Sequence, residues 1–216
     1  MIAWEKSAVS RTANVWLCLL FLGCAAASPP VEYYLLTPAV DPAPAASGEG
    51  DRLLRKIALR PVSLPDVLGR PQLIVRTGET TVRVAEFHRW AGSLNREIAR
   101  VLIENLNLLL HDLPAFAATD DLATDPDLTV SVQVLRFDGQ PGGEVELNAL
   151  WSLVQRGPKG IRLLRQTRIR IPCETPGFAG LALAHSRALA ALSREIAADI
   201  RTAPLPPSPE SPQTRQ

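Results

Sequence analysis

Cysteine and histidine are scarce in this chain of 216 residues, with only three of each. All six lie far apart along the sequence, at Cys18, Cys24, Cys173, His88, His111 and His185. Structural zinc sites are usually built from cysteine or histidine pairs a few residues apart, and small disulfide-bonded domains need several cysteines. The sequence therefore predicts neither a zinc site nor a framework of disulfide bonds.

An excess of charge of either sign is also missing. Lysine and arginine together number 23 and aspartate and glutamate 22, so the net charge is +1. A nucleic-acid-binding protein usually shows a basic excess on one face, so we expect no nucleic-acid partner. Hydrophobic residues make up 46% of the chain and recur along most of it, which suits one folded domain and excludes an intrinsically disordered chain.

The motifs of common catalytic and ion-binding sites are absent as well. The chain has no G-x-S-x-G motif, and no serine or cysteine partner for a histidine is recognisable. The aspartates Asp120, Asp121, Asp125 and Asp127 lack the spacing of a calcium loop, which favours a solvated loop. The stretch 139–143 lacks the strand-to-helix context of a phosphate-binding loop, which favours a hairpin turn. We therefore expect no catalytic residue, no metal and no cofactor, and interpret the protein as not an enzyme.

The N-terminal residues have the organisation of a secretory signal peptide. Lys6 and Arg11 precede eight consecutive apolar residues, Val15 to Leu22, and small residues follow. This apolar run is too short to span a bilayer, which needs about 20 residues. The pattern predicts a segment that directs export.

Two cleavage positions fit this signal peptide. The segment Leu20 to Cys24 resembles a bacterial lipoprotein box, in which Cys24 would receive a diacylglyceryl group and become the new N-terminus. The alternative is an A-x-A site at Ala25 to Ala27, whose cleavage would release a soluble protein beginning at Ser28. We favour lipidation of Cys24, because a cysteine directly after the apolar run is otherwise hard to explain in so cysteine-poor a chain. Its acyl chains, palmitate among them, would hold the protein on a membrane at about 0.8 kcal/mol per buried CH₂.

Composition divides the chain into four parts. Residues 1–23 are the expected lipoprotein signal peptide, and residues 24–50 a lipid-anchored tether with a first strand at 31–37 and a flexible Ala/Pro/Ser/Gly linker at 39–50. Residues 51–201 carry the periodic apolar pattern of a folded domain, to which the first strand belongs. Residues 202–216, rich in Pro, Ser and Gln, are expected to be disordered.

The hydrophobic periodicity predicts an α+β fold. Alternation of apolar and polar residues predicts strands within 31–36, 53–60, 72–76, 80–84, 128–137, 145–153 and 161–171, with a bulge near Leu135. Apolar residues three and four apart predict amphipathic helices over 94–109 and 178–200. The prediction is a mainly antiparallel sheet of about seven strands with two amphipathic helices packed on one face.

The same periodicity predicts which side chains form the core. Those expected to be buried where the helices meet the sheet are Leu102, Leu106, Trp151, Leu192 and Ile196. His185 lies near the apolar stripe of the second helix, which favours a partly buried histidine with a hydrogen-bonding partner over a ligand.

Six short segments have a recognisable order and spacing. They are Tyr33–Pro38, Leu64–Arg76, Glu86–Leu94, Val101–Leu106, Arg136–Asp138 and Leu147–Trp151. Together they resemble the PqiC/YmbA family of ABC-type (MCE-associated) transport auxiliary lipoproteins. The resemblance extends from about Val31 to Arg201, which is nearly the whole folded part.

This resemblance implies a role in the bacterial envelope. It implies a periplasm-facing lipoprotein of the outer membrane that works with an MCE-type or ABC-type transporter moving lipids or other hydrophobic molecules, as an adaptor or structural subunit. Ala25 stands where an Asp commonly retains lipoproteins in the inner membrane, which agrees with outer-membrane sorting. The alternatives are a soluble periplasmic protein, and a lipid or small-molecule carrier with its own apolar cavity. Apolar stripes that line a cavity and those that form a core look alike in sequence, so both functions stay open.

Four residues are candidates for partner contact: Trp90, Arg162, Arg168 and Arg170. Tryptophan and arginine are enriched at the centres of interfaces. A tryptophan just before a helix is more often a core residue, and a solvated strand face is the default interpretation of the three arginines. A transporter subunit would be one such partner, and a second copy another, because a meander leaves strand edges that can pair.

Overall fold

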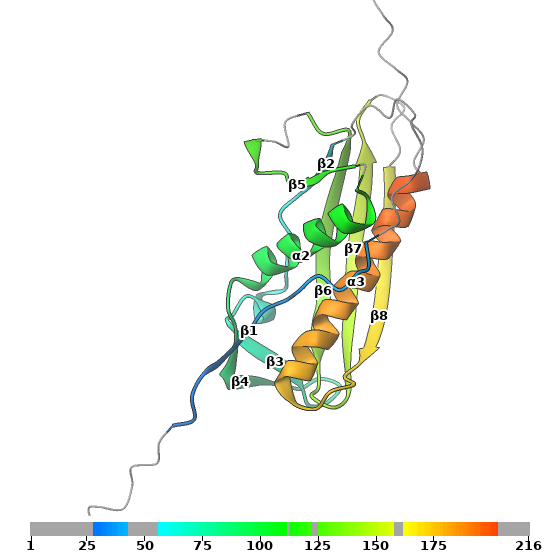
Figure 1. Cartoon of the computed structure of the whole chain (residues 1–216). Coiled ribbons are helices and arrows are strands. Elements are labelled where there is room, and N and C mark those ends of the chain that lie inside the picture. Colours follow the sequence, from blue (N-terminus) through cyan, green and yellow to red (C-terminus); the bar gives the residue numbers. More distant parts are fainter. Residues whose placement is uncertain (1–27, 43–55, 112, 122–124, 158–161, 203–216) are drawn as a thin grey trace, which may run out of the picture. The chain divides into compact units, whose positions relative to one another are not determined.

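The computed structural model describes residues 28–42, 56–111, 113–121, 125–157 and 162–202 (Figure 1). The chain divides into two compact units, Met1–Pro30 and Val31–Gln216, and the second contains the folded domain. Cys24, most of the linker at 39–50 and nearly all of the tail at 202–216 lie outside the described residues.

Eight strands form one mixed sheet in the described part of the chain. They are β1 Glu32–Tyr34, β2 Ile57–Leu59, β3 Gln72–Arg76, β4 Val82–Trp90, β5 Ala115–Ala117, β6 Leu128–Gly139, β7 Glu144–Gln155 and β8 Arg162–Pro172. One path through the sheet runs β1-β4-β3-β6-β2-β5, while β7 and β8 follow from β6. The long pairs β6–β7, β7–β8 and β3–β4 are antiparallel, whereas β1–β4, β2–β5, β2–β6 and β3–β6 are parallel. The predicted α+β class is confirmed. The sheet is mixed, because the short strands pair in parallel, which the sequence did not predict.

The meander β6–β7–β8 is the regular part of the sheet. Alternation places Val145, Leu147, Ala149, Trp151 and Leu153 on the buried side of β7, because successive side chains point to opposite faces. The register of β6 against β7 shifts between Val134 and Arg136, which confirms the predicted bulge.

A tight turn joins β6 to β7, as predicted for residues 139–143. The amide of Gly143 donates to the carbonyl of Gln140 at 2.9 Å, and Gly142 has a φ of 75°. Only glycine fits at position 139, because the Cβ of any other residue would lie 2.5 Å from the carbonyl oxygen of Glu144.

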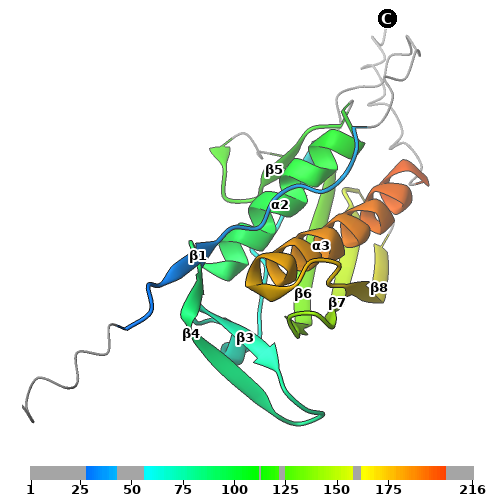
Figure 2. The same ribbon diagram turned by 60° about the horizontal axis from the view of Figure 1, so that its bottom comes forward.

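Two helices cover one face of the sheet, as Figure 2 shows. Helix α2 spans Leu94–Leu109 and helix α3 spans Gly177–Thr202, and the two pack against each other. Between them the amide of Asn105 donates to the hydroxyl of Ser193 at 3.2 Å, and both side chains are fully buried. This pair satisfies polar groups that would otherwise be costly inside the core.

The predicted core is confirmed. Leu102, Leu106, Leu192 and Ile196 are completely inaccessible to solvent, and Trp151 is 1% exposed. The indole nitrogen of Trp151 donates to the hydroxyl of Thr167 at 3.1 Å, so this large side chain is buried without an unsatisfied donor.

The segment after β1 is more ordered than expected. Leu36 and Val40 are buried, and the backbone amides of Thr37 and Ala39 donate to Ser186 of α3 and Asn105 of α2. The prediction of a flexible linker beginning at Ala39 is therefore wrong for its first residues. The buried side chains of Leu36 and Val40, together with these two hydrogen bonds, hold residues 36–40, the N-terminal arm, across both helices.

Several elements differ from the sequence-based expectation in length or number. β4 continues to Trp90 instead of ending near residue 84, so that the helix follows it almost directly. The short strand β5 and a 3₁₀ turn at Asp66–Leu68 were not expected. Both are too short to have a periodicity of their own.

Candidate functional site

The described residues contain no cluster of three or more histidine, cysteine, aspartate or glutamate side chains that could hold a metal ion. Among them, no helix has the length and apolar character needed to cross a membrane.

Trp90 belongs to the core and is 5% exposed. Its ring packs edge-to-face against His185, whose ring also meets Phe137 with centroids 4.5 Å apart. Of its two interpretations, the structure supports the core residue, because the indole is not available at the surface.

His185 is more deeply buried than predicted, at 2% exposure. Its Nδ1 donates to the carbonyl of Leu181 at 2.8 Å. Burial disfavours the charged ring and lowers the pKa of His185 to about 4. The residue is thus a neutral hydrogen-bonding member of the core.

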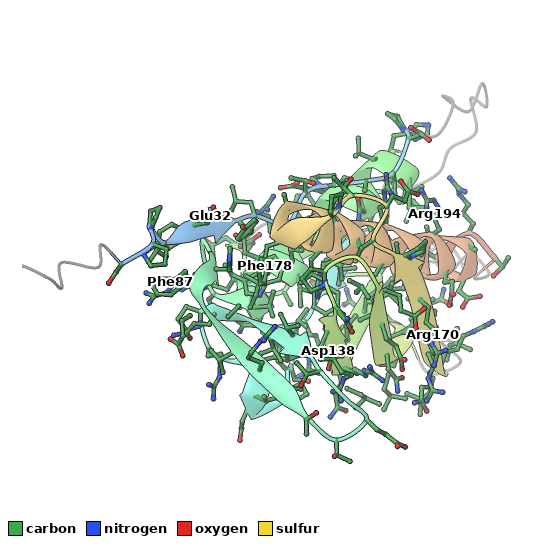
Figure 3. All side chains as sticks on the ribbon, turned by 90° about the horizontal axis from the view of Figure 1, so that it is seen from below. Glu32, Phe87, Asp138, Arg170, Phe178 and Arg194 are labelled. Atoms are coloured by element: carbon green, nitrogen blue, oxygen red, sulfur yellow. The ribbon has the colours of Figure 1, made fainter. Side chains whose placement is uncertain are left out.

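His88, two residues before Trp90 in β4, contacts neighbouring elements. Its ring stacks on Phe178 of α3 with centroids 3.6 Å apart, and its Nδ1 lies 2.9 Å from the hydroxyl of Tyr34. Burial, together with the hydrogen bond to Glu32, raises the pKa of Tyr34 to about 12. Figure 3 shows Glu32 and Phe178 at this end of α3. These contacts join β1 and β4 to the helix layer.

The face of the meander opposite the helices carries charge. Arg165 and Thr167 of β8 contact Asp199 and Glu195 of α3, so the odd-numbered positions of β8 point toward the helices. The even-numbered positions, Arg168 and Arg170 among them, must point to the other side. Figure 3 shows Asp138 and Arg170 away from α3, in contrast to Arg194. We call this side the open face.

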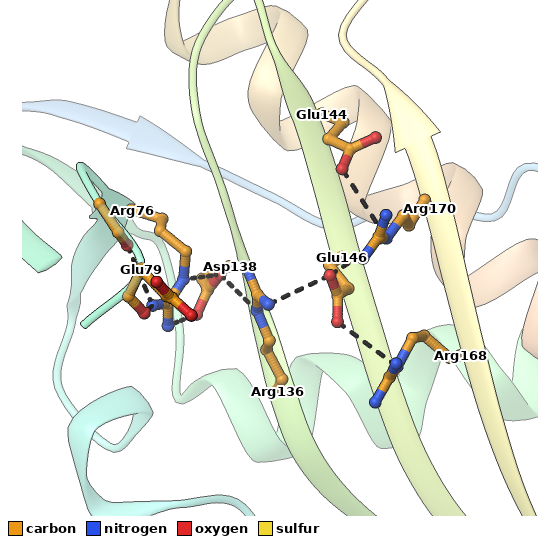
Figure 4. Close-up of polar contacts among 9 residues, drawn as sticks. Arg76, Glu79, Arg136, Asp138, Glu144, Glu146, Arg168 and Arg170 are labelled. Carbon is orange, nitrogen blue, oxygen red and sulfur yellow. Dashed lines mark hydrogen bonds and ion pairs between the residues drawn. The ribbon is translucent and has the colours of Figure 1, made fainter. Parts of the chain in front are cut away.

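Glu146 is the centre of the charge network on the open face, shown in Figure 4. Its carboxylate lies 3.1 Å from Nη1 of Arg136, 3.2 Å from Nε of Arg170 and 3.6 Å from Nε of Arg168. Arg170 also pairs with Glu144. The side chain of Glu146 is 8% exposed, while those of Arg168 and Arg170 are 61% and 58% exposed. A buried carboxylate thus holds two solvent-facing guanidinium groups.

Asp138 continues the network toward the β3–β4 hairpin. It accepts two hydrogen bonds from Arg76, at 2.8 and 2.7 Å, and one from Arg136 at 3.0 Å. Burial alone would raise the pKa of Asp138, but these charged hydrogen bonds outweigh it and hold the pKa below its usual value. The carboxylate is therefore ionised and ties the hairpin to β6.

The network as a whole presents an excess of positive charge. Four guanidinium groups, from Arg76, Arg136, Arg168 and Arg170, meet three carboxylates, from Asp138, Glu144 and Glu146. Two of the three arginines predicted from the sequence thus lie together on an exposed face. The third, Arg162, lies in β8 at an even-numbered position, and its side chain is outside the described residues.

The acidic half of this site and Arg76 were not predicted from the sequence. Glu146 was not considered, although its even-numbered position in an alternating strand placed it opposite the apolar residues. Asp138 is predicted only as the last residue of the segment Arg136–Asp138, with no partner assigned to it. Arg76 lies 62 residues from Asp138, and no local pattern predicts that contact.

A groove lies elsewhere, between α2 and the β2–β5 edge. Its volume is about 490 Å³, and its lining includes Leu59, Val62, Ala99, Ile103 and Ala117. It is the kind of apolar depression that the carrier alternative requires.

Comparison with known proteins identifies the family. Residues 33–197 match the model of the ABC-type transport auxiliary lipoprotein component. The chain belongs to this family. Its relatives include the intermembrane transport lipoprotein PqiC of Escherichia coli K12, which is 25% identical over 145 residues covering 67% of this chain and 72% of PqiC. A PqiC of Shigella flexneri matches equally well.

Solved structures agree with the fold of this ABC-type transport auxiliary lipoprotein. A crystal structure of an uncharacterized protein, 21% identical, has a TM-score of 0.66 and covers 80% of this chain and 99% of its own. A protein of Xanthomonas campestris, 19% identical, has a TM-score of 0.58 and covers 77% of this chain and 93% of its own. The expected PqiC/YmbA relationship is confirmed.

Proposed function

We propose that the protein is an anchored adaptor of an ABC-type or MCE-type system that moves lipids or other hydrophobic molecules across the bacterial envelope. The observation that carries this proposal is the open face, where buried Glu146 fixes Arg168 and Arg170 in an exposed position. Side chains that are already ordered lose less entropy when a partner binds. Membership of a transport auxiliary family supports a transporter subunit as that partner.

The open face is suited to an acidic surface of the partner. Its arginines outnumber its carboxylates, and guanidinium groups form bidentate pairs with carboxylates. Complementary charge speeds association and selects the partner more than it adds affinity. The proposed partner therefore presents Asp or Glu side chains to β7 and β8.

Neutralising the open face should weaken this association. In the double variant Arg168→Gln/Arg170→Gln the amides still donate to Glu146, but two exposed charges are lost. We expect recovery of transporter subunits with the protein, purified from its native membrane, to fall at least fivefold. Recovery with the unaltered protein should decline as the salt concentration rises, because exposed charges are screened.

The matched control is Arg70→Gln/Arg83→Gln, which removes two exposed arginines outside the open face. This control should retain its partners. Equal recovery from both double variants would overturn the role of the open face, and recovery of the unaltered protein as a solitary monomer with turnover of a small substrate would favour an enzyme instead.

The anchor of the proposed adaptor is Cys24, on the periplasmic face of the outer membrane. Cys24→Ala should release or mislocalise the protein, because the acyl chains provide its hold on the membrane. Membrane fractionation with mass spectrometry of the mature N-terminus measures this. Cys173→Ala, at the buried free cysteine, serves as control and should stay membrane-bound. An unmodified N-terminus at Ser28 in the unaltered protein would refute the anchor.

The carrier alternative is favoured by one observation, the groove between α2 and the β2–β5 edge. A carrier would retain a hydrophobic ligand during gentle purification, whereas a pure adaptor would not. Mass spectrometry of the lipids that remain with the purified protein distinguishes the two.

A further inference from the structure

The groove between α2 and the β2–β5 edge has an apolar floor. Its volume of about 490 Å³ falls within the range of about 300–1,000 Å³ of small-molecule sites. The floor is made by Leu59, Val62, Ala99, Ile103 and Ala117. These side chains come from β2, the segment after it, α2 and β5, and together they form an apolar surface that can receive an alkyl chain.

Three arginines stand at the rim of this groove, and they differ in how their charge is compensated. Arg100 is paired with Glu97 and Glu104, each at 2.8 Å, and also donates to the carbonyl of Leu36. The guanidinium groups of the other two, Arg60 and Arg96, make no hydrogen bond or ion pair with any described residue. Both are exposed. The groove therefore combines an apolar floor with two uncompensated positive charges.

We propose that this groove binds a single-chain amphipathic anion, with its acyl chain on the floor and its carboxylate or phosphate head at Arg60 and Arg96. Guanidinium groups match both head groups through paired hydrogen bonds. A neutral apolar ligand would leave the two charges without partners. A stable protein interface needs about 20–30 residues on each side, whereas twelve residues line this groove. Arg60 also lines a second depression, which includes Leu150 and Leu164 on the open face, but the groove contains none of the Glu146 network. The proposal therefore does not depend on the adaptor role.

The test uses the full-length protein reconstituted in phosphatidylcholine nanodiscs. A photoreactive palmitate analogue is added, irradiated, and its attachment mapped by peptide mass spectrometry. We expect attachment to residues 59–62, 94–109 and 115–119, the three segments that line the groove. Excess oleate or oleoyl lysophosphatidic acid should compete, and methyl oleate, which has the chain without the charge, should not. The relative strength of the two anions distinguishes a carboxylate from a phosphate head.

Two variants probe the two halves of the site. Arg60→Glu/Arg96→Glu reverses the rim charge and should reduce attachment at these segments at least fivefold. Ala99→Trp fills the floor without changing charge and should do the same. Arg70→Glu/Arg83→Glu, the same change of charge away from the groove, should leave attachment unaltered. Circular dichroism confirms that each variant is folded.

Three results would overturn the proposal. One is attachment outside these three segments, and another is equal attachment in the rim variant and its control. The third is a change of oligomeric state in Ala99→Trp without any attachment of lipid to the unaltered protein, which would mean that a second copy occupies the groove. None of these results involves Glu146, Arg168 or Arg170, and Ala99 lines the groove but not the depression on the open face. Failure here and failure of the adaptor role are therefore separable.

Discussion

Replacing Leu106 with alanine is expected to lower the free energy of unfolding by about 2–5 kcal/mol. Leu106 is completely buried on α2, in the core shared with the sheet and α3. The substitution removes apolar contacts and leaves a cavity that close-packed neighbours fill only in part. Urea denaturation of the two proteins, followed by circular dichroism, measures the difference.

The control for this prediction is the same substitution at Leu183 on α3. Leu183 is 40% exposed, so Leu183→Ala should change stability by about 0.5 kcal/mol or less. Equal losses at the two positions would contradict the packing of α2 against the sheet.

The protein should lose stability on acidification from pH 6.5 to pH 4 because of His185. Burial lowers the pKa of this histidine from 6.5 to about 4 in the folded state. The stability it contributes is therefore complete above pH 6.5 and is lost as the unfolded chain takes up the proton first. At 1.36 kcal/mol per pH unit, the loss reaches about 3 kcal/mol near pH 4.

His185→Gln isolates this effect, since the amide does not titrate and can still donate to the carbonyl of Leu181. The variant will be less stable at pH 7, where it lacks the ring contacts with Trp90 and Phe137. Its stability should nevertheless vary less with pH than that of the unaltered protein. Asp138 is present in both proteins, so it does not affect the comparison. Its pKa is lowered in the folded state, and the stability it contributes is lost mainly as the pH falls below the ordinary aspartate value of 3.8. Parallel pH profiles of the two proteins would show that His185 does not titrate as inferred.

The elements that could be predicted from the sequence are those with a repeating pattern. Apolar residues at every second position identified β6, β7 and β8, and the change of phase at Leu135 identified the bulge. Apolar residues three and four apart identified α2 and α3. These patterns are local, because the spacing of side chains along one element decides which of them share a face.

The candidate site was only half predictable for the same reason. Arg168 and Arg170 fall on one face of β8 by alternation, and this much is local. Their partner Glu146 is on another strand, and its burial depends on the arginine side chains that cover it. The sequence around an acidic residue in a strand does not indicate how many arginine or lysine side chains from other strands will surround it.

The amino-acid sequence by itself determined the class of the fold, its core and the family to which the chain belongs, because each depends on patterns carried by consecutive residues. Tertiary structure decided the parallel pairings of the short strands, the path of residues 36–40 across the helices, and the contact of Arg76 with Asp138. The groove also forms only in the folded domain, where Arg60 after β2 and Arg96 of α2 line it together. These features join residues far apart in the chain, and the free energy that selects them comes from packing and charge pairing that exist only once the whole domain has folded.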